Sequence, residues 1–194
     1  MEKLLYPLWK APSLSGDEFR DELLLQLAPK LTGIEGVHGL RICVVDSAVS
    51  AAAGRRIESH APVPDAMLSL WVDFAGAAGN WEPLIDAHVS TKTVYLVAEA
   101  EPLVSQQTHP AMPGERLYGV CQVVFMSPPD DMDRDKWLST WKDSHTQVAI
   151  DTQSTFGYRQ NLVVRRMTAD TPGCFAVVEE NFPPEAMASD HAFY

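Results

Sequence analysis

The sequence predicts an α+β protein made of tandem β-α-β-β-α-β units whose antiparallel sheets pack as an α/β barrel. Short runs rich in β-branched and aromatic residues indicate strands, and an amphipathic segment after the first run indicates a helix. The third observation is a repeat, because a fixed shift of 118 maps Phe19 to Trp137 and Leu40 to Tyr158. We therefore expect a duplicated fold in one chain.

The first unit is predicted to span residues 1–105 and to be the more diverged copy. Its strands are predicted over 4–9, 39–46, 67–74 and 93–104. Apolar residues recur at every fourth position at Phe19, Leu23, Leu27 and Leu31. This period predicts an amphipathic helix over about 16–31. A second helix is expected over 79–89, and a long polar loop separates the second and third strands.

Residues 106–116 contain two prolines and a glycine with few apolar residues, which is typical of a linker. The second unit is predicted over 117–194, with one helix over about 133–150. Its strands are expected over 118–126, 156–167 and 174–182. Carrying the repeat further would place a fourth strand beyond Tyr194, so we expect this unit to be incomplete at its C-terminal end.

Composition argues against several classes of function. The formal net charge of -11 would repel a nucleic-acid backbone. No run of 18 apolar residues occurs, and Pro7 interrupts the N-terminal apolar segment before it reaches signal-peptide length. The three cysteines lie in apolar runs without metal-ligand spacing, and no pair of histidines has H-x-x-x-H spacing with a third ligand. We expect a cytoplasmic protein that binds neither nucleic acid nor membrane and has no metal site.

The helix over 133–150 carries Trp137, Trp141 and His145 along one face. Because the repeat aligns His145 with Leu27, we expect the imidazole to be buried and to need a partner or a cavity. A lone histidine on an apolar face can also be an ordinary core residue. The two tryptophans are either core packing or a platform on which a ligand stacks.

Polar residues also replace apolar ones on the strand that follows this helix. Tyr158, Gln160 and Asn161 lie where the first unit has Leu40, Ile42 and Cys43. Because side chains alternate along a strand, Tyr158 and Gln160 share one face and Asn161 lies on the other. Only one of these faces can meet the helix.

The segments WLSTWKDSHTQVA and FGYRQNLVVRRM resemble the signature of the EthD family. The matching positions are Trp141, His145, Tyr158 and Asn161, and the resemblance covers about residues 118–182. It implies a ferredoxin-like unit of the dimeric α/β-barrel superfamily. EthD-like proteins are associated with bacterial breakdown of ether fuels, and relatives in the superfamily include cofactor-free monooxygenases, lactone isomerases and haem-degrading enzymes.

These observations lead to the hypothesis of an oxidoreductase in the oxidative catabolism of a small apolar or aromatic molecule. His145 would be the general acid or base, and Tyr158 or Asn161 would orient the substrate or stabilise an oxyanion. Trp137, Trp141 and Gln160 would contact the substrate. We expect no cofactor, with haem on His145 as a minor alternative.

Two other classes of function stay open at this point. The chain could be a non-catalytic binding protein or an accessory to an oxygenase system, or it could be a dehydratase or isomerase. The duplication bears on assembly, since two units in one chain can form an internal pseudo-dimer and leave the protein monomeric. A homodimer is the alternative.

Overall fold

The computed structural model describes residues 1–58, 62–169 and 171–194. These residues form two compact units. Unit 1 comprises Met1–Ala98 and Val164–Pro172, and unit 2 comprises Glu99–Val163 and Gly173–Tyr194. Residues 59–61 of the predicted polar loop lie outside the described part of the chain. These units are defined by contacts in space, whereas the predicted repeat boundaries were defined by sequence similarity. The repeat boundaries therefore stay a prediction.

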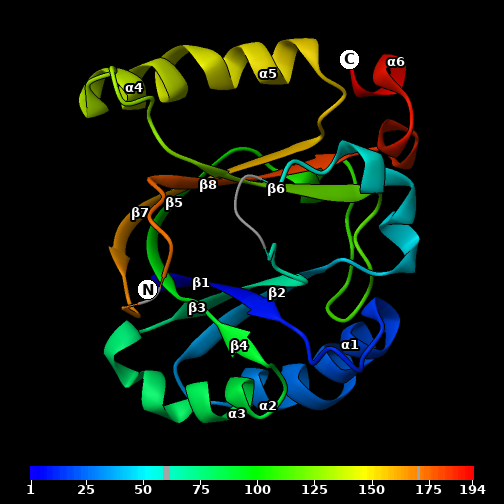
Figure 1. Ribbon diagram of the computed structural model, residues 1–194, viewed down its shortest axis with the longest axis vertical. Helices are drawn as coiled ribbons and strands as arrows, with labels where there is room; N and C mark the ends of the chain where they lie inside the picture. The colour runs from blue at the N-terminus through cyan, green and yellow to red at the C-terminus, as the bar shows by residue number, and fades with distance from the viewer. Residues whose placement is uncertain (59–61, 170) are drawn as a thin grey trace. The chain divides into compact units, whose positions relative to one another are not determined.

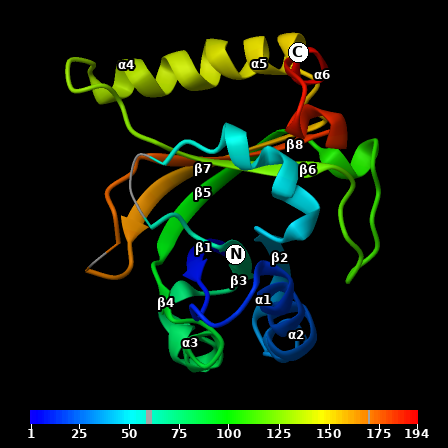
Figure 2. The same cartoon turned by 45° about the vertical axis from the view of Figure 1, so that its right-hand side comes forward.

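Unit 1 contains a small antiparallel sheet with helices packed against it. The strands are β1 (Glu2–Trp9), β2 (Val37–Val44), β3 (Ala66–Val72), β4 (Thr91–Lys92) and the start of β5 (Tyr95–Leu103). Their order is β2-β3-β1-β5, and β4 pairs with β1. The helical segments are α1 (Gly16–Glu22), the π-helix η1 (Leu23–Leu27), α2 (Ala28–Thr32), the 3-10 helices η2 (Ser47–Arg55) and η3 (Ala75–Asn80), and α3 (Glu82–Asp86). Figure 2 shows α1, α2 and α3 along the same side of β1 and β3.

The predicted helix over 16–31 is confirmed as the continuous run from α1 to α2. All four residues of its predicted apolar stripe are fully buried. They meet the face of β1 that carries Leu4, Tyr6 and Leu8. Complete burial of one such side chain stabilises the fold by about 1.5–3 kcal/mol, so this stripe explains why the helix packs on the sheet.

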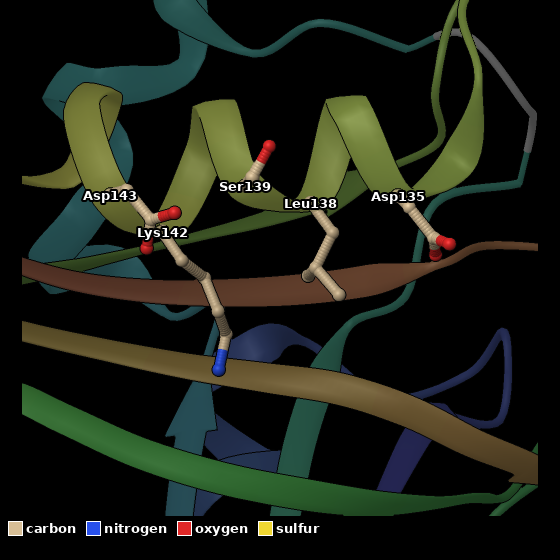
Figure 3. A pocket seen from close by; sticks show the side chains of 5 residues that line it. All are labelled: Asp135, Leu138, Ser139, Lys142 and Asp143. Carbon is tan, nitrogen blue, oxygen red and sulfur yellow. The ribbon is translucent and has the colours of Figure 1, made fainter.

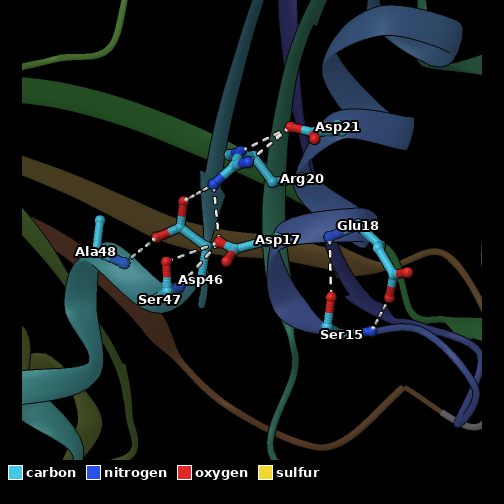
Figure 4. Close-up of polar contacts among 8 residues, drawn as sticks. All are labelled: Ser15, Asp17, Glu18, Arg20, Asp21, Asp46, Ser47 and Ala48. Carbon is cyan, nitrogen blue, oxygen red and sulfur yellow. Dashed lines mark hydrogen bonds and ion pairs between the residues drawn. The ribbon is translucent and has the colours of Figure 1, made fainter.

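Charged side chains fix the start of this helix to the loop after β2, as Figure 4 shows. Ser15 caps the helix by accepting from the Glu18 amide, and Glu18 accepts from the Ser15 amide. The Arg20 guanidinium contacts Asp17 at 2.8 Å and Asp46 at 3.1 Å. Because the Asp46 carboxylate is fully buried, this contact supplies charge compensation that water cannot.

Unit 2 consists of a sheet under one long helical segment (Figure 1). The strands are the end of β5, β6 (Val120–Met126), β7 (Gly157–Arg166) and β8 (Ala176–Phe182). Their order is β5-β7-β8-β6, and β8 pairs antiparallel with both β6 and β7. The long segment comprises α4 (Arg134–Ser139), the π-helix η5 (Thr140–His145) and α5 (Thr146–Thr152). The short helices are η4 (Ser105–Gln107), η6 (Pro184–Met187) and α6 (Asp190–Phe193).

The predicted α+β class with antiparallel sheets is confirmed. Both long helices also contain a π turn at positions related by the shift of 118. The Ala28 amide donates to the Leu23 carbonyl, and the Thr146 amide donates to the Trp141 carbonyl. This agreement is what a duplication would produce, although the duplication itself stays a prediction. Among the described residues, no helix is both long enough and apolar enough to cross a bilayer.

Candidate functional site

The helix of unit 2 begins at a strong cap and changes its hydrogen bonding in the middle. The Asp133 carboxylate accepts from the amides of Asp135 and Lys136, which starts α4. At η5 the backbone bond from Thr146 to Trp141 spans five residues in place of four. A π turn therefore adds a residue between successive inward positions, and such turns are frequent at functional sites.

The prediction that His145 is buried is wrong, because this side chain is exposed. Trp141 is 3% exposed and faces the sheet, but the next fully inward residue is Thr146, which is 4% exposed. The predicted stripe assumed four residues per inward step throughout the helix. The π turn leaves two consecutive residues, His145 and Thr146, near the inner direction, and here Thr146 is the buried one.

The first helix shows why the same turn had a different result in each unit. There Leu27 is fully buried and Ala28, which corresponds to Thr146, is half-buried. A π turn places two consecutive residues on either side of the inner direction, and side-chain chemistry decides between them. Leucine gains from burial in hydrocarbon, whereas imidazole without a partner does not.

Thr146 joins a buried polar network under the helix. Its hydroxyl donates to the Trp141 carbonyl at 2.7 Å and accepts from the Gln160 amide at 2.7 Å. The indole Nε1 of Trp141 donates to the Tyr158 hydroxyl at 3.2 Å. Tyr158 and Gln160, at 3% and 4% exposure, thus share the helix-facing side of β7, as the alternation predicted.

The strand next to β7 adds a carboxyl group that the sequence patterns did not predict. Glu180 pairs in register with Tyr158, so their side chains project from the same face of the sheet. Glu180 is 9% exposed. Within the described part of the chain, this carboxyl has neither an ion-pair partner nor a hydrogen-bond partner. A buried carboxyl without compensation is costly to ionise.

Burial raises the pKa of Glu180 from 4.5 to about 7. Burial also raises the pKa of the Tyr158 phenol, the hydrogen bond from Trp141 opposes this rise, and the charge of Glu180 adds to it. Near neutral pH the carboxyl therefore exchanges its proton readily, while the phenol stays protonated. Such a pair can transfer a proton and donate a hydrogen bond to the same ligand.

Asn161 lies on the opposite face of β7 and is not brought together with this network. Its amide donates to the Val177 carbonyl at 3.0 Å and to the Glu179 carboxylate at 3.1 Å. Arg159 on the same face contacts Glu99 at 2.9 Å and also forms an ion pair with Glu101. The catalytic role predicted for Asn161 stays a prediction. Because the two side chains lie on opposite faces of β7, Asn161 cannot contact a ligand together with Tyr158.

Trp137 and Trp141 pack against each other, with ring centroids 5.5 Å apart, in the apolar cluster under the helix. This supports core packing for both. A shallow pocket of about 340 Å³ lies along the same helix and is lined by Asp135, Leu138, Ser139, Lys142 and Asp143. In Figure 3, Leu138 and Lys142 extend towards the strands, whereas Ser139 points away from them. Its charged lining is unlike that of a site for an apolar ligand.

The strand segment around Glu180 contained a signal that could have revealed it. Val178 and Glu180 occupy alternate positions, and Val178 belongs to the apolar cluster under the helix. Side chains alternate along a strand, so a residue two positions from one that faces the helix also faces the helix. Because Val178 faces the helix, alternation turns Glu180 to that face and Glu179 to the other, and both are buried. That Tyr158 lies beside Glu180 follows only from the strand register.

Comparisons with known proteins support the fold. No protein-family model and no curated protein sequence matches the chain. An anthrone oxidase-like protein of known structure superposes with a TM-score of 0.55 and 13% identity, covering 98% of this chain and 74% of the other. A chlorite dismutase candidate gives a TM-score of 0.51 and 13% identity, covering 96% and 82%. At 13% identity these likenesses show a shared fold and identify no family, so the resemblance to the EthD family stays a prediction.

The residues of unit 2 do not provide the enclosed axial ligand that haem binding through His145 requires. The His145 side chain is exposed, and it is not part of the lining of the pocket on its helix.

Proposed function

We propose that this chain is an EthD-like small-molecule enzyme of oxidative type, in which Glu180 removes a proton from an activated carbon of an apolar aromatic ketone. The observation that carries this proposal is the buried, unpaired carboxyl of Glu180 beside the buried phenol of Tyr158. A general base is most effective when its pKa lies near the working pH, and Glu180 meets this condition. Molecular oxygen is the proposed oxidant.

Tyr158 would stabilise the anion that forms when the proton leaves. Its hydroxyl oxygen accepts from Trp141 and also interacts with Thr146. In the proposed complex its O–H donates to the ligand. Thr146 holds Gln160 and the Trp141 carbonyl in place around this phenol. A preorganised donor at a developing oxyanion in a water-poor environment is a large source of rate enhancement.

The likeness to an anthrone oxidase-like protein supplies a suitable probe. Anthrone is a fused-ring ketone with an acidic methylene group opposite its carbonyl. Loss of a methylene proton to Glu180 gives a resonance-stabilised anion, and oxygen adds to that carbon. The methylene becomes a second carbonyl and the other oxygen atom leaves as water, so anthrone and oxygen give anthraquinone and water.

The test compares the parent protein with Glu180→Gln, which keeps the shape of the side chain and removes its basicity. Turnover of anthrone, followed by oxygen consumption and anthraquinone absorbance, should fall by about 100-fold or more. Glu185→Gln at an exposed position is the matched control. Turnover of Glu180→Gln at the parent rate, with folding intact, would exclude the proposed base.

A second measurement separates proton removal from oxidation. Without oxygen, the parent should exchange the methylene hydrogens of anthrone with deuterated water, and Glu180→Gln should not. Exchange without any oxidation in air would favour an isomerase or dehydratase. A Soret band in the purified protein would show that haem is involved after all.

A further inference from the structure

The residues around Glu180 show from which side a ligand can reach it. In the registers of β6, β8 and β7, Gln122 lies opposite Glu180, and Glu180 lies opposite Tyr158. Residues opposite each other in antiparallel strands project from the same face. These three side chains therefore form a row across the helix-facing side of the sheet in unit 2.

Exposure changes steadily along this row. Gln122 is exposed, Glu180 is 9% exposed and Tyr158 is 3% exposed. The exposed end lies on β6, the last strand in the order of this sheet. Of the two neighbours of Glu180 in this row, the one towards the β6 edge, Gln122, is therefore the one that solvent reaches.

The Gln122 side chain is available for a ligand. Within the described part of the chain its amide makes no hydrogen bond or ion pair to protein. Val120 and Val124 lie two residues to either side on the same face of β6, and both are half-buried. A single amide between two aliphatic side chains suits a molecule that is mostly apolar but carries one hydrogen-bonding oxygen.

We propose that Gln122 is the specificity-determining residue at the entrance to this site, and that its amide N–H binds the carbonyl or hydroxyl oxygen of an otherwise apolar ligand. This inference rests on the proposed function for the chemistry that follows binding. The binding itself depends only on the row of Gln122, Glu180 and Tyr158. The expected ligand is an apolar molecule that carries one oxygen acceptor.

The test measures binding of anthrone and of dihydroanthracene, which has a similar frame without the carbonyl, by quenching of tryptophan fluorescence. The parent should prefer anthrone by about tenfold, the effect of one good hydrogen bond. Gln122→Met should remove this preference, with little change in the affinity for dihydroanthracene. Gln26→Met, at an exposed position in η1, is the matched control and should keep the preference.

Two outcomes distinguish failure of this inference from failure of the proposed function. If Gln122→Met prefers anthrone as strongly as the parent, or if the parent shows no preference, the role of Gln122 is refuted. If the preference depends on Gln122 but Glu180→Gln still turns over anthrone normally, the entrance is supported and only the proposed base is wrong. Compared with the parent enzyme, Gln122→Met should have a higher KM for anthrone and the same pH dependence of kcat.

Discussion

Glu180 lies directly across the β7–β8 pair from Tyr158, and both side chains are buried on the helix-facing side of the sheet. The electrostatic coupling of the two groups is visible in the phenol, because the charge of Glu180 contributes to raising the pKa of Tyr158. A buried acid next to a buried hydroxyl has consequences for stability as well as for chemistry.

The stability of the protein should fall as pH rises through the neutral range. The Glu180 pKa is about 7 in the folded state against 4.5 ordinarily, so the folded state binds the proton more tightly. The stabilising contribution is complete below the ordinary pKa and is lost by on the order of 3 kcal/mol as pH rises through the folded pKa. Urea unfolding at about pH 5 and about pH 8 should show this loss in the parent and in Glu185→Gln but not in Glu180→Gln. The same change in the free energy of unfolding between the two pH values in all three proteins would rule it out.

Turnover should increase with pH, as expected for a general base. Only the ionised carboxylate of Glu180 accepts a proton, so kcat/KM for anthrone should rise with pH and level off above about 7. Rates are corrected for the enzyme-free reaction, since anthrone ionises by itself in alkali. A rate that declines across this range would point to a general acid instead.

Thr146 should contribute to stability through its hydroxyl. Thr146→Val keeps the shape and leaves the Trp141 carbonyl and the Gln160 amide without their partner, which costs about 1–3 kcal/mol. Thr146→Ser keeps the hydroxyl and should lose less in urea unfolding. A loss as large in Thr146→Ser as in Thr146→Val would mean that packing of the methyl group, and not hydrogen bonding, holds this position.

His145→Ala should have little effect. The side chain is exposed, so the free energy of unfolding should change by less than about 0.5 kcal/mol. Turnover of anthrone should stay close to that of the parent. If turnover is lost while ligand affinity is kept, the role first predicted for His145 is correct and Glu180 is not the base.

The apolar periods predicted most of the elements because burial enforces them. Phe19 and Leu23 locate the first helix, and the strand over 174–182 contains β8 as observed. The position of His145 could not be obtained in this way. A period of four is the same whether or not a π turn intervenes, and the choice between His145 and Thr146 depends on partners from β7.

The candidate site was predictable in part. Strand alternation alone separates Tyr158 and Gln160 from Asn161, and the structure agrees. Glu180 was missed because glutamate within a strand is usually solvated, and its burial depends on the register between β7 and β8. That register is a long-range property that local patterns do not fix.

The most direct test is an NMR titration of the glutamate carboxyl carbons in the parent and in Glu180→Gln. We predict one resonance in the parent that titrates near pH 7 and is missing from the variant. Titration of every glutamate in the parent near the ordinary value of about 4.3 would contradict it, because Glu180 would then carry a full charge at neutral pH like any surface carboxylate.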